Sequence, residues 1–139
     1  PDLTLVADIL DLQGQLQAGK NVTLQAQNRV QIRDSSSTPF TGVAGNRLLI
    51  RGDRSVDIGI LSHPGSGLWS GQDLVLQSGN PIVGDAHFYA GRNLQIEQLN
   101  GNPGKLFSPQ DPVILAAANV SLGDYEGASL HILAGGECH

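Results

Sequence analysis

The chain has 139 residues, a formal net charge of −5 and a pI near 5.1. Hydrophobic residues make up 40% of it, yet aromatic residues only 4%, Met is absent and Gly occurs 18 times. This composition favours short strands, tight turns and a narrow aliphatic core over a helical bundle. The few basic residues are scattered, which argues against nucleic acid as a partner, and no apolar run is long enough to span a membrane.

The chain begins at Pro1 without a signal-peptide pattern, which predicts a mature chain or a piece of a longer one. Its single cysteine, Cys138, cannot form an internal disulfide and leaves the redox compartment open.

A short phrase recurs along the chain: a small residue, usually Gly, any residue, Asn or Asp, and then alternating apolar and polar positions. Its copies begin at Ala18, Ala44, Ser70, Ala90 and Ala116, with half a copy at Asp2 and the start of another at Ala134. The Asn/Asp position falls at 2, 21, 47, 73, 93 and 119, with Arg in its place at 47, so two of the five intervals are short and three are longer. The longer intervals predict a basic coil with insertions in the Ser-, Gly- and Pro-rich segments Ser35–Thr38, His63–Gly67 and Gly101–Pro112.

Each coil contains three short segments of alternating apolar and polar residues, which is a strand signal. The first follows the phrase, as in Val22–Leu24, and the second is Val30–Ile32, echoed by Val56–Ile58. The third leads into the next phrase, at Gly67–Ser70, His87–Ala90, Val113–Ala116 and His131–Ala134. Three strands per coil predict an all-β fold, a right-handed parallel β-helix of about six coils that fills residues 1–139 as a single domain.

This register predicts two rows of apolar residues that point inward, with one residue from each coil in each row. One row runs from Leu3 to Val120 and the other from Leu5 to Leu122. Coils about 4.8 Å apart would bury them only by stacking on one another. The repeated Gly suggests a turn with positive φ, and the Asn or Asp after it a local hydrogen bond.

The phrases at Ala18–Leu24 and Ala90–Ile96, together with the segment Gly123–Gly136, resemble filamentous-haemagglutinin-like exoproteins of bacteria. The resemblance covers nearly the whole chain, but its motifs specify a type of coil more than a particular protein. It implies a right-handed β-helical rod, export by two-partner secretion, a location outside the cell or on its surface, and a role in attachment. The Asn-Pro-Asn motifs of that family's secretion module are absent, which indicates a shaft segment.

Two candidate interaction sites emerge. Arg51-Gly52-Asp53 is a tripeptide known in integrin-binding adhesins, although a plain turn at this position is the simpler explanation. If Leu68, Phe88, Ile114 and Ile132 point inward, alternation sends an apolar line outward on one face: Val43, Trp69, Tyr89, Leu115 and Leu133. Insertion loops such as 101–112 could cover this line, another chain could pack on it, or Trp69 and Tyr89 could stack on sugar rings.

An enzyme is the alternative from another class, because parallel β-helices include polysaccharide lyases and hydrolases. Asp53, Asp57, Asp73 and Asp85 lie in the middle coils, but most fit turns or outward positions, and Lys105 has no obvious acidic partner. His87 and His131 occupy equivalent positions two coils apart, too far to share a metal ion. We therefore predict no catalytic residues, no metal and no cofactor.

The leading interpretation is a structural or adhesive shaft of a secreted surface protein. Its expected partners are itself (end to end or side by side), neighbouring coils of a parent chain, and host-cell or matrix receptors or glycans. The alternatives are a filament subunit that stacks end to end, since open strand edges invite continuation, and a polysaccharide-binding or polysaccharide-processing β-helix.

Overall fold

The computed structural model describes residues 2–110, 112–127 and 131–136, and within them all regular secondary structure is β-strand. The strands are β1 (Leu3–Leu12), β2 (Gln15–Ala18), β3 (Val22–Arg33), β4 (Thr41–Ala44), β5 (Leu48–Gly52), β6 (Ser55–Gly59), β7 (Gly67–Ser70), β8 (Leu74–Ser78), β9 (Ile82–Asp85), β10 (His87–Ala90), β11 (Leu94–Glu97), β12 (Leu106–Ser108), β13 (Val113–Ala116), β14 (Val120–Ser121), β15 (Tyr125–Gly127) and β16 (His131–Ala134).

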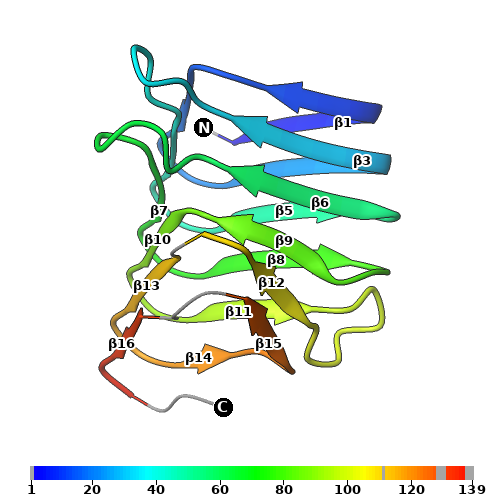
Figure 1. The fold of residues 1–139 in the computed structure, drawn as a ribbon, viewed down its shortest axis with the longest axis vertical. Coiled ribbons are helices and arrows are strands. Elements are labelled where there is room, and N and C mark those ends of the chain that lie inside the picture. The colour runs from blue at the N-terminus through cyan, green and yellow to red at the C-terminus, as the bar shows by residue number, and fades with distance from the viewer. Residues whose placement is uncertain (1, 111, 128–130, 137–139) are drawn as a thin grey trace.

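The strands stack in layers, one for each pass of the chain, and form two sheets (Figure 1). The six-stranded sheet runs β16-β13-β10-β7-β4-β2, and the ten-stranded sheet contains β14-β11-β8-β5-β3-β6-β9-β12-β15 with β1 paired to β3. Every pairing between these strands is parallel, and one isolated antiparallel bridge joins Glu97 and Pro103. The arrangement is compatible with a parallel β-helix.

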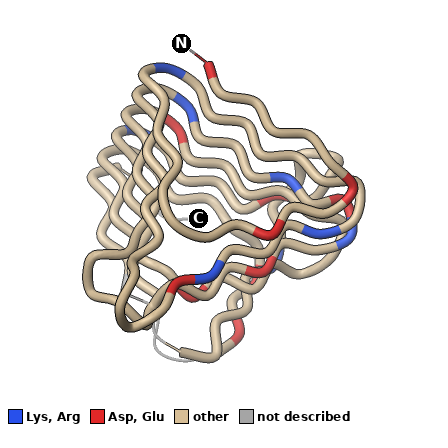
Figure 2. Tube along the Cα trace, turned by 90° about the horizontal axis from the view of Figure 1, so that it is seen from above, with Lys and Arg blue, Asp and Glu red and all other residues tan. Residues whose placement is uncertain are grey.

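The ten-stranded sheet curls because β1 and β3 continue through a bend that interrupts the strands of other layers. At this bend the register between β1 and β3 shifts after Ala7, which pairs with Ala26, whereas Ile9 pairs with Arg29. The curled sheet therefore supplies two walls of a three-sided coil, and the six-stranded sheet supplies the third (Figure 2).

The observed register confirms the spacing of the repeated phrase. Cα partners along the first wall are Leu3, Val22, Leu48, Leu74, Leu94 and Val120, each of which directly follows the Asn/Asp position of its copy. Each layer is therefore offset from the next by the interval between two copies of the phrase. The second predicted row is also confirmed as far as Ile96, and Leu122, just beyond β14, is 8% exposed.

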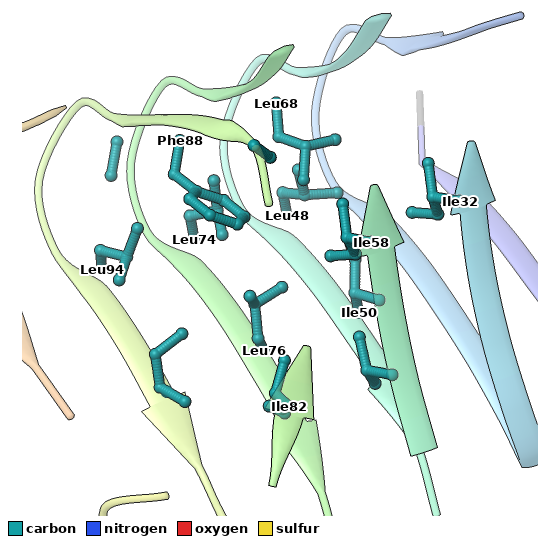
Figure 3. Close-up of a cluster of buried hydrophobic side chains, with 14 of the residues drawn as sticks. Ile32, Leu48, Ile50, Ile58, Leu68, Leu74, Leu76, Ile82, Phe88 and Leu94 are labelled. Carbon is teal, nitrogen blue, oxygen red and sulfur yellow. The ribbon is translucent and has the colours of Figure 1, made fainter. Parts of the chain in front are cut away.

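The core lies between the three walls and is almost wholly aliphatic (Figure 3). Leu68, Phe88 and Ile114 are at most 1% exposed, as the alternation predicted, and Ile132 is half-buried against the same cluster. Because each layer contributes only a few apolar side chains, neighbouring layers must stack to bury them.

The segment of the repeated phrase between the six-stranded sheet and the next layer forms a tight corner, made by residues 19–21, 45–47, 71–73, 91–93 and 117–119. The predicted positive φ is wrong here: among the described residues only Gly14, Gly101 and Gly127 have it. Gly is needed instead because layers approach closely. A Cβ on Gly45 would collide with the carbonyl oxygen of Gly19, and one on Gly71 with that of Gly45.

The Asn and Asp side chains of the tight corner also act between layers, so the predicted local hydrogen bond is wrong. Asn21 Oδ1 accepts the N–H of Arg47 at 3.2 Å, and Asp73 Oδ1 accepts the N–H of Asn93 at 3.2 Å. Asn93 Oδ1 accepts the N–H of Asn119 at 3.1 Å. Each side chain thus satisfies a backbone donor one layer further along the stack.

The opposite end of the six-stranded sheet has a loop corner, which we define as residues 34–40 and 60–66. The insertions predicted at Ser35–Thr38 and His63–Gly67 lie there, although β7 already begins at Gly67. The loop predicted over Gly101–Pro112 is wrong in part, because it contains β12, where Leu106 pairs with Ile82. The short Leu106–Ser108 alternation was hidden among Gly and Pro residues.

Candidate functional site

The five residues of the predicted apolar line lie in one register on the outer side of the six-stranded sheet, and we call them the outer strip. Val43 pairs with Trp69, Trp69 with Tyr89, Tyr89 with Leu115 and Leu115 with Leu133. Leu133 is 69% exposed and the other four are half-buried. The strand that carries each residue turns its neighbours inward, so the core fixes the strip's direction.

Two aromatic rings form the centre of the outer strip. Trp69 and Tyr89 are stacked, with ring centroids 5.3 Å apart and ring planes 7° from parallel. The His87 ring meets Tyr89 edge-on, and the Tyr89 hydroxyl lies 3.4 Å from His87 Nδ1. Since the two rings cover each other and their register neighbours are Val43 and Leu115, the pair does not offer two free ring faces to a sugar.

A shallow open groove of about 670 Å³ runs beside the strip. Tyr89, Leu115 and Leu133 line one side, and small residues of the strand ends and the tight corner line the rest, namely Ser70, Ala90, Gly91, Ala116, Ala117, Ala134 and Gly135. The loop at 98–105 does not cover this side of the molecule. Figure 1 shows it beyond β11, on the side opposite β10 and β13.

The tripeptide Arg51-Gly52-Asp53 ends β5 and begins the following bend. Arg51 Nε and Asp53 Oδ1 are 3.0 Å apart, so the two charged side chains pair with each other. The backbone is held on both sides, because Asp53 donates its N–H to Ala26 O and accepts that of Gly79. A receptor role for this motif stays a prediction.

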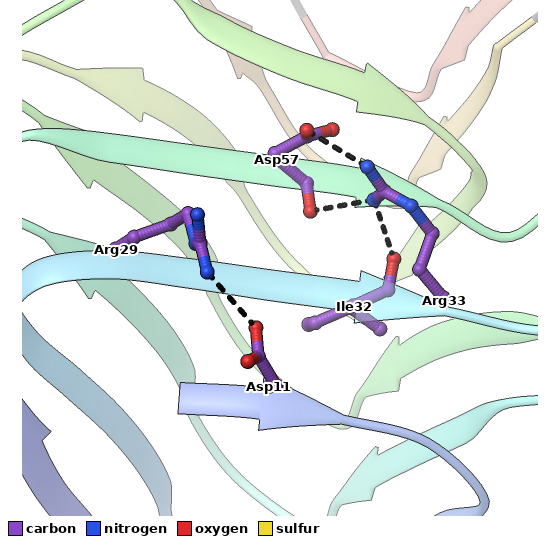
Figure 4. Close-up of polar contacts among 5 residues, drawn as sticks. All are labelled: Asp11, Arg29, Ile32, Arg33 and Asp57. Atoms are coloured by element: carbon purple, nitrogen blue, oxygen red, sulfur yellow. Dashed lines mark hydrogen bonds and ion pairs between the residues drawn. The ribbon is translucent and has the colours of Figure 1, made fainter. Parts of the chain in front are cut away.

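A cluster of charged residues that the sequence did not reveal lies on the outer side of the ten-stranded sheet (Figure 4). Arg33 Nη2 is 2.8 Å from Asp57 Oδ2, and its Nη1 donates to the carbonyl oxygens of Asp57 and Ile32. Arg29 Nη2 is 3.7 Å from Asp11 Oδ1. Each carboxylate is therefore matched with an arginine from a neighbouring layer.

Beside this cluster is a polar pocket of about 270 Å³, lined by Asp11, Leu12, Gln13, Gln31 and Arg33. Arg29 Nε nearby is buried without a hydrogen-bond partner. The charges of the arginines and carboxylates around the pocket compensate each other. This cluster of polar and charged residues could have been predicted from the sequence by aligning the repeats, because Asp11, Gln31 and Asp57 share one register position.

The middle-layer carboxylates do not converge on a reaction centre. Asp53 and Asp57 are ion-paired, and Asp73 supports the tight corner. Asp85 is only 3% exposed, and its Oδ1 accepts hydrogen bonds from Ser108 Oγ and from Gln110 N, the latter at 2.9 Å. It ties β9 to the end of β12.

Lys105 does have an acidic partner, which corrects the sequence-based expectation. Its Nζ lies 2.8 Å from Glu126 Oε2, one layer along the stack. The hydrogen bond and charge of Glu126 raise the pKa of Lys105 above its usual value, and those of Lys105 lower the pKa of Glu126.

Metal-binding residues were not predicted, and the described part of the chain contains no group of three or more His, Cys, Asp or Glu that could hold a metal ion. Val113 lies between His87 and His131 in the register, as the repeat predicted. Cys138 lies outside the described residues.

No helix in the described ranges is long and apolar enough to cross a membrane. Comparison with protein-family models, with curated proteins and with solved structures finds no match to this chain. The resemblance to filamentous-haemagglutinin-like exoproteins therefore stays a prediction.

Proposed function

We propose that the chain is a right-handed parallel β-helix of about six coils, and that it serves as a structural shaft of a secreted bacterial surface adhesin or extracellular fibre. The observation that carries this proposal is the unbroken parallel register from β1 to β14 along the first wall. A rod needs each layer to template the next, and this register provides that.

The recurring chemistry of the layers also supports a role in stacking over one in catalysis. The repeated Gly of the tight corner permits contact between layers, and the Asn or Asp after it bonds to the next layer. The carboxylates in the middle layers are engaged with arginine, serine or backbone groups. The adhesive and secreted parts of the proposal rest on the family resemblance alone.

A second candidate, a filament subunit that stacks end to end, is favoured by the state of β1. Among the described strands β1 pairs only with β3, so its other edge is available to a further strand, whether of the same chain or of another copy. Core-facing Leu3, Leu5, Leu10 and Leu12 are only partly buried, so the apolar core reaches the surface there. An open edge above an exposed core invites another strand.

Electron microscopy of the purified chain over a concentration series tests these proposals. A rod or fibre with an axial repeat of about 4.8 Å in diffraction is expected. Absence of that repeat would overturn the shaft, whereas single particles that show it would overturn only growth into filaments. Turnover of neutral or acidic polysaccharides by the chain would favour the third possibility, an enzyme or glycan-binding β-helix.

The variant Thr4→Pro distinguishes a shaft segment from a filament subunit that stacks end to end. Leu3 donates its N–H to Asn21 O at 2.8 Å, so the alternation of a parallel strand turns the N–H of Thr4 toward the open edge. Thr4→Pro removes that donor without removing a bond to β3. If fibres form by end-to-end stacking, Thr4→Pro shortens them to single rods, whereas unchanged fibres would exclude growth from this edge.

A further inference from the structure

The outer face of the six-stranded sheet, over the strands that the structure describes, carries no Lys, Arg, Asp or Glu. Its strands read QLQA, TGVA, GLWS, HFYA, VILA and HILA. Figure 2 shows the contrast: charged positions gather along the other two walls and at the corners, and the flank between the tight corner and the loop corner has none. A protein with a net charge of −5 thus keeps the described strands of one whole wall free of Lys, Arg, Asp and Glu.

The outer surface of the same wall has a shape suited to an apolar contact between two sheets. The outer strip forms a ridge whose Leu133 is 69% exposed. Next to the ridge lies the groove of about 670 Å³, whose lining includes the small residues Ala90, Ala116 and Ala134. An apolar sheet face with an exposed Leu at its edge is a candidate for contact with another macromolecule.

We propose that this wall is the lateral contact between two copies of the chain, packed sheet against sheet with the outer strip of each copy on the groove of the other. This inference rests on the proposed rod. Two copies with a charge of −5 repel each other, and the repulsion and desolvation cost are smallest where neither copy buries a charge. This wall, whose described strands carry no Lys, Arg, Asp or Glu, meets that requirement, while Asp11, Asp57 and Glu126 lie on the ten-stranded sheet.

Carbohydrate is a poorer occupant of this wall. Trp69 and Tyr89 stack on each other at 5.3 Å, which leaves their edges for contact instead of their faces. An isologous contact between two identical sheets needs only shape and apolar area, and sheets pack face to face about 10 Å apart.

The size of the wall predicts a weak contact. Six four-residue strands about 4.8 Å apart give a flat footprint of roughly 400 Å² on each copy. That is about half the area each partner buries in a stable complex of standard size, so single copies should associate reversibly. Along a continuous rod the same contact would repeat and add up.

Trp69 is the only tryptophan, so its fluorescence reports directly on this wall. The experiment combines sedimentation equilibrium with Trp69 emission over a concentration series, with a reductant present so that Cys138 cannot link copies. It uses the wild-type chain and the Thr4→Pro variant, in which we expect end-to-end growth to be suppressed. A reversible dimer whose formation shifts Trp69 emission to shorter wavelength is expected.

The decisive variant is Leu133→Lys, which places a charge on the exposed ridge and should weaken dimerisation by about tenfold or more. Phe107→Lys is the matched control, because Phe107 is also exposed (36%) but lies on the ten-stranded sheet. It should leave dimerisation unchanged. A monomer at all concentrations, equal effects of both variants, or dimerisation without a shift in Trp69 emission would each overturn the proposal. Rods that stay monomeric would overturn the lateral contact alone, and the absence of rods would overturn the proposed function.

Discussion

The two corners that flank the six-stranded sheet both turn the chain and hold neighbouring layers together, but they do so with different groups. The tight corner turns the chain within a short segment in each layer and uses backbone approach at Gly45, Gly71 and Gly91. The loop corner uses longer segments and relies on one side chain, Asp34. Its Oδ2 accepts the His63 N–H at 2.9 Å and the Ser66 hydroxyl at 2.6 Å, and its Oδ1 accepts the Ser62 N–H at 3.3 Å.

This difference shows where the stack tolerates variation. At the tight corner every layer is in contact with the next, so a change in one layer displaces its neighbours. At the loop corner, Asp34 and Ser66 connect two particular loops, and Ser66 Oγ in turn accepts the Phe40 N–H at 3.0 Å. Insertions are accommodated there because the rest of the wall does not depend on them.

The largest effect is expected for Gly71→Val at the tight corner. The new side chain would collide with Gly45 O, and the layers would have to separate. We expect a loss of stability of about 3 kcal/mol or more, measured by urea unfolding followed through Trp69 fluorescence. Gln72→Val, at the adjacent exposed position, is the control and should unfold close to wild type. Equal stability of the two variants would contradict the close-approach argument.

At the loop corner, Asp34→Ala should cost about 2 kcal/mol, because three donors lose a charged acceptor. Hydrogen exchange should accelerate at Ser62 and His63, while amides of the tight corner stay protected. Ser36→Ala, in the same loop and exposed, provides the comparison. Faster exchange throughout the molecule after Asp34→Ala would mean that the two corners are not independent.

The tight corner can also be improved. At position 47 the Asn/Asp ladder is interrupted by Arg, whose side chain has no acceptor for the N–H of Asp73. Arg47→Asn should supply that bond and raise the free energy of unfolding by about 0.5–1 kcal/mol. Arg47→Ala, which removes the charge without adding an acceptor, separates the hydrogen bond from the loss of charge. If both variants gain equally, the ladder is not the cause.

The smallest effect on stability is expected for the exposed ion pair of Lys105 and Glu126. This pair lies outside both corners, so its loss gives a reference against which the corner variants can be compared. The pKa of Glu126 is lowered, so its stabilising contribution is present above the ordinary Glu pKa and lost as pH falls through the folded value. The pKa of Lys105 is raised, so its contribution is lost only as pH rises through that higher value. Glu126→Gln should lower the urea midpoint slightly at neutral pH and leave it unchanged in acid and at high salt.

The strands and their register could be predicted because alternation and repeat length are local properties of the sequence. The third strands, from Gly67–Ser70 to His131–Ala134, were predicted with the bounds observed. The function of the repeated Gly could not be read correctly, because positive φ and close approach demand the same residue. β12 was missed for another reason: a short strand between Gly- and Pro-rich stretches carries too little alternation.

The candidate sites, too, could be predicted only where they follow from the repeat pattern. The outer strip could be predicted because its members share one repeat position. Asp34 with Ser66, Asp85 with Ser108 and Lys105 with Glu126 could not, since the two members of each pair occupy different positions of the repeat. Side-chain pairing across layers depends on rotamers that the pattern leaves free.

The regular offset between paired layers, one copy of the phrase each time, has a kinetic consequence. Each new layer closes a chain loop of similar length, so the entropy of adding a layer stays nearly the same however many precede it. Growth from a formed nucleus should then proceed one layer at a time in either direction. If the chain left a narrow pore from one end, each copy of the repeated phrase that emerged would allow one further layer to fold onto the stack.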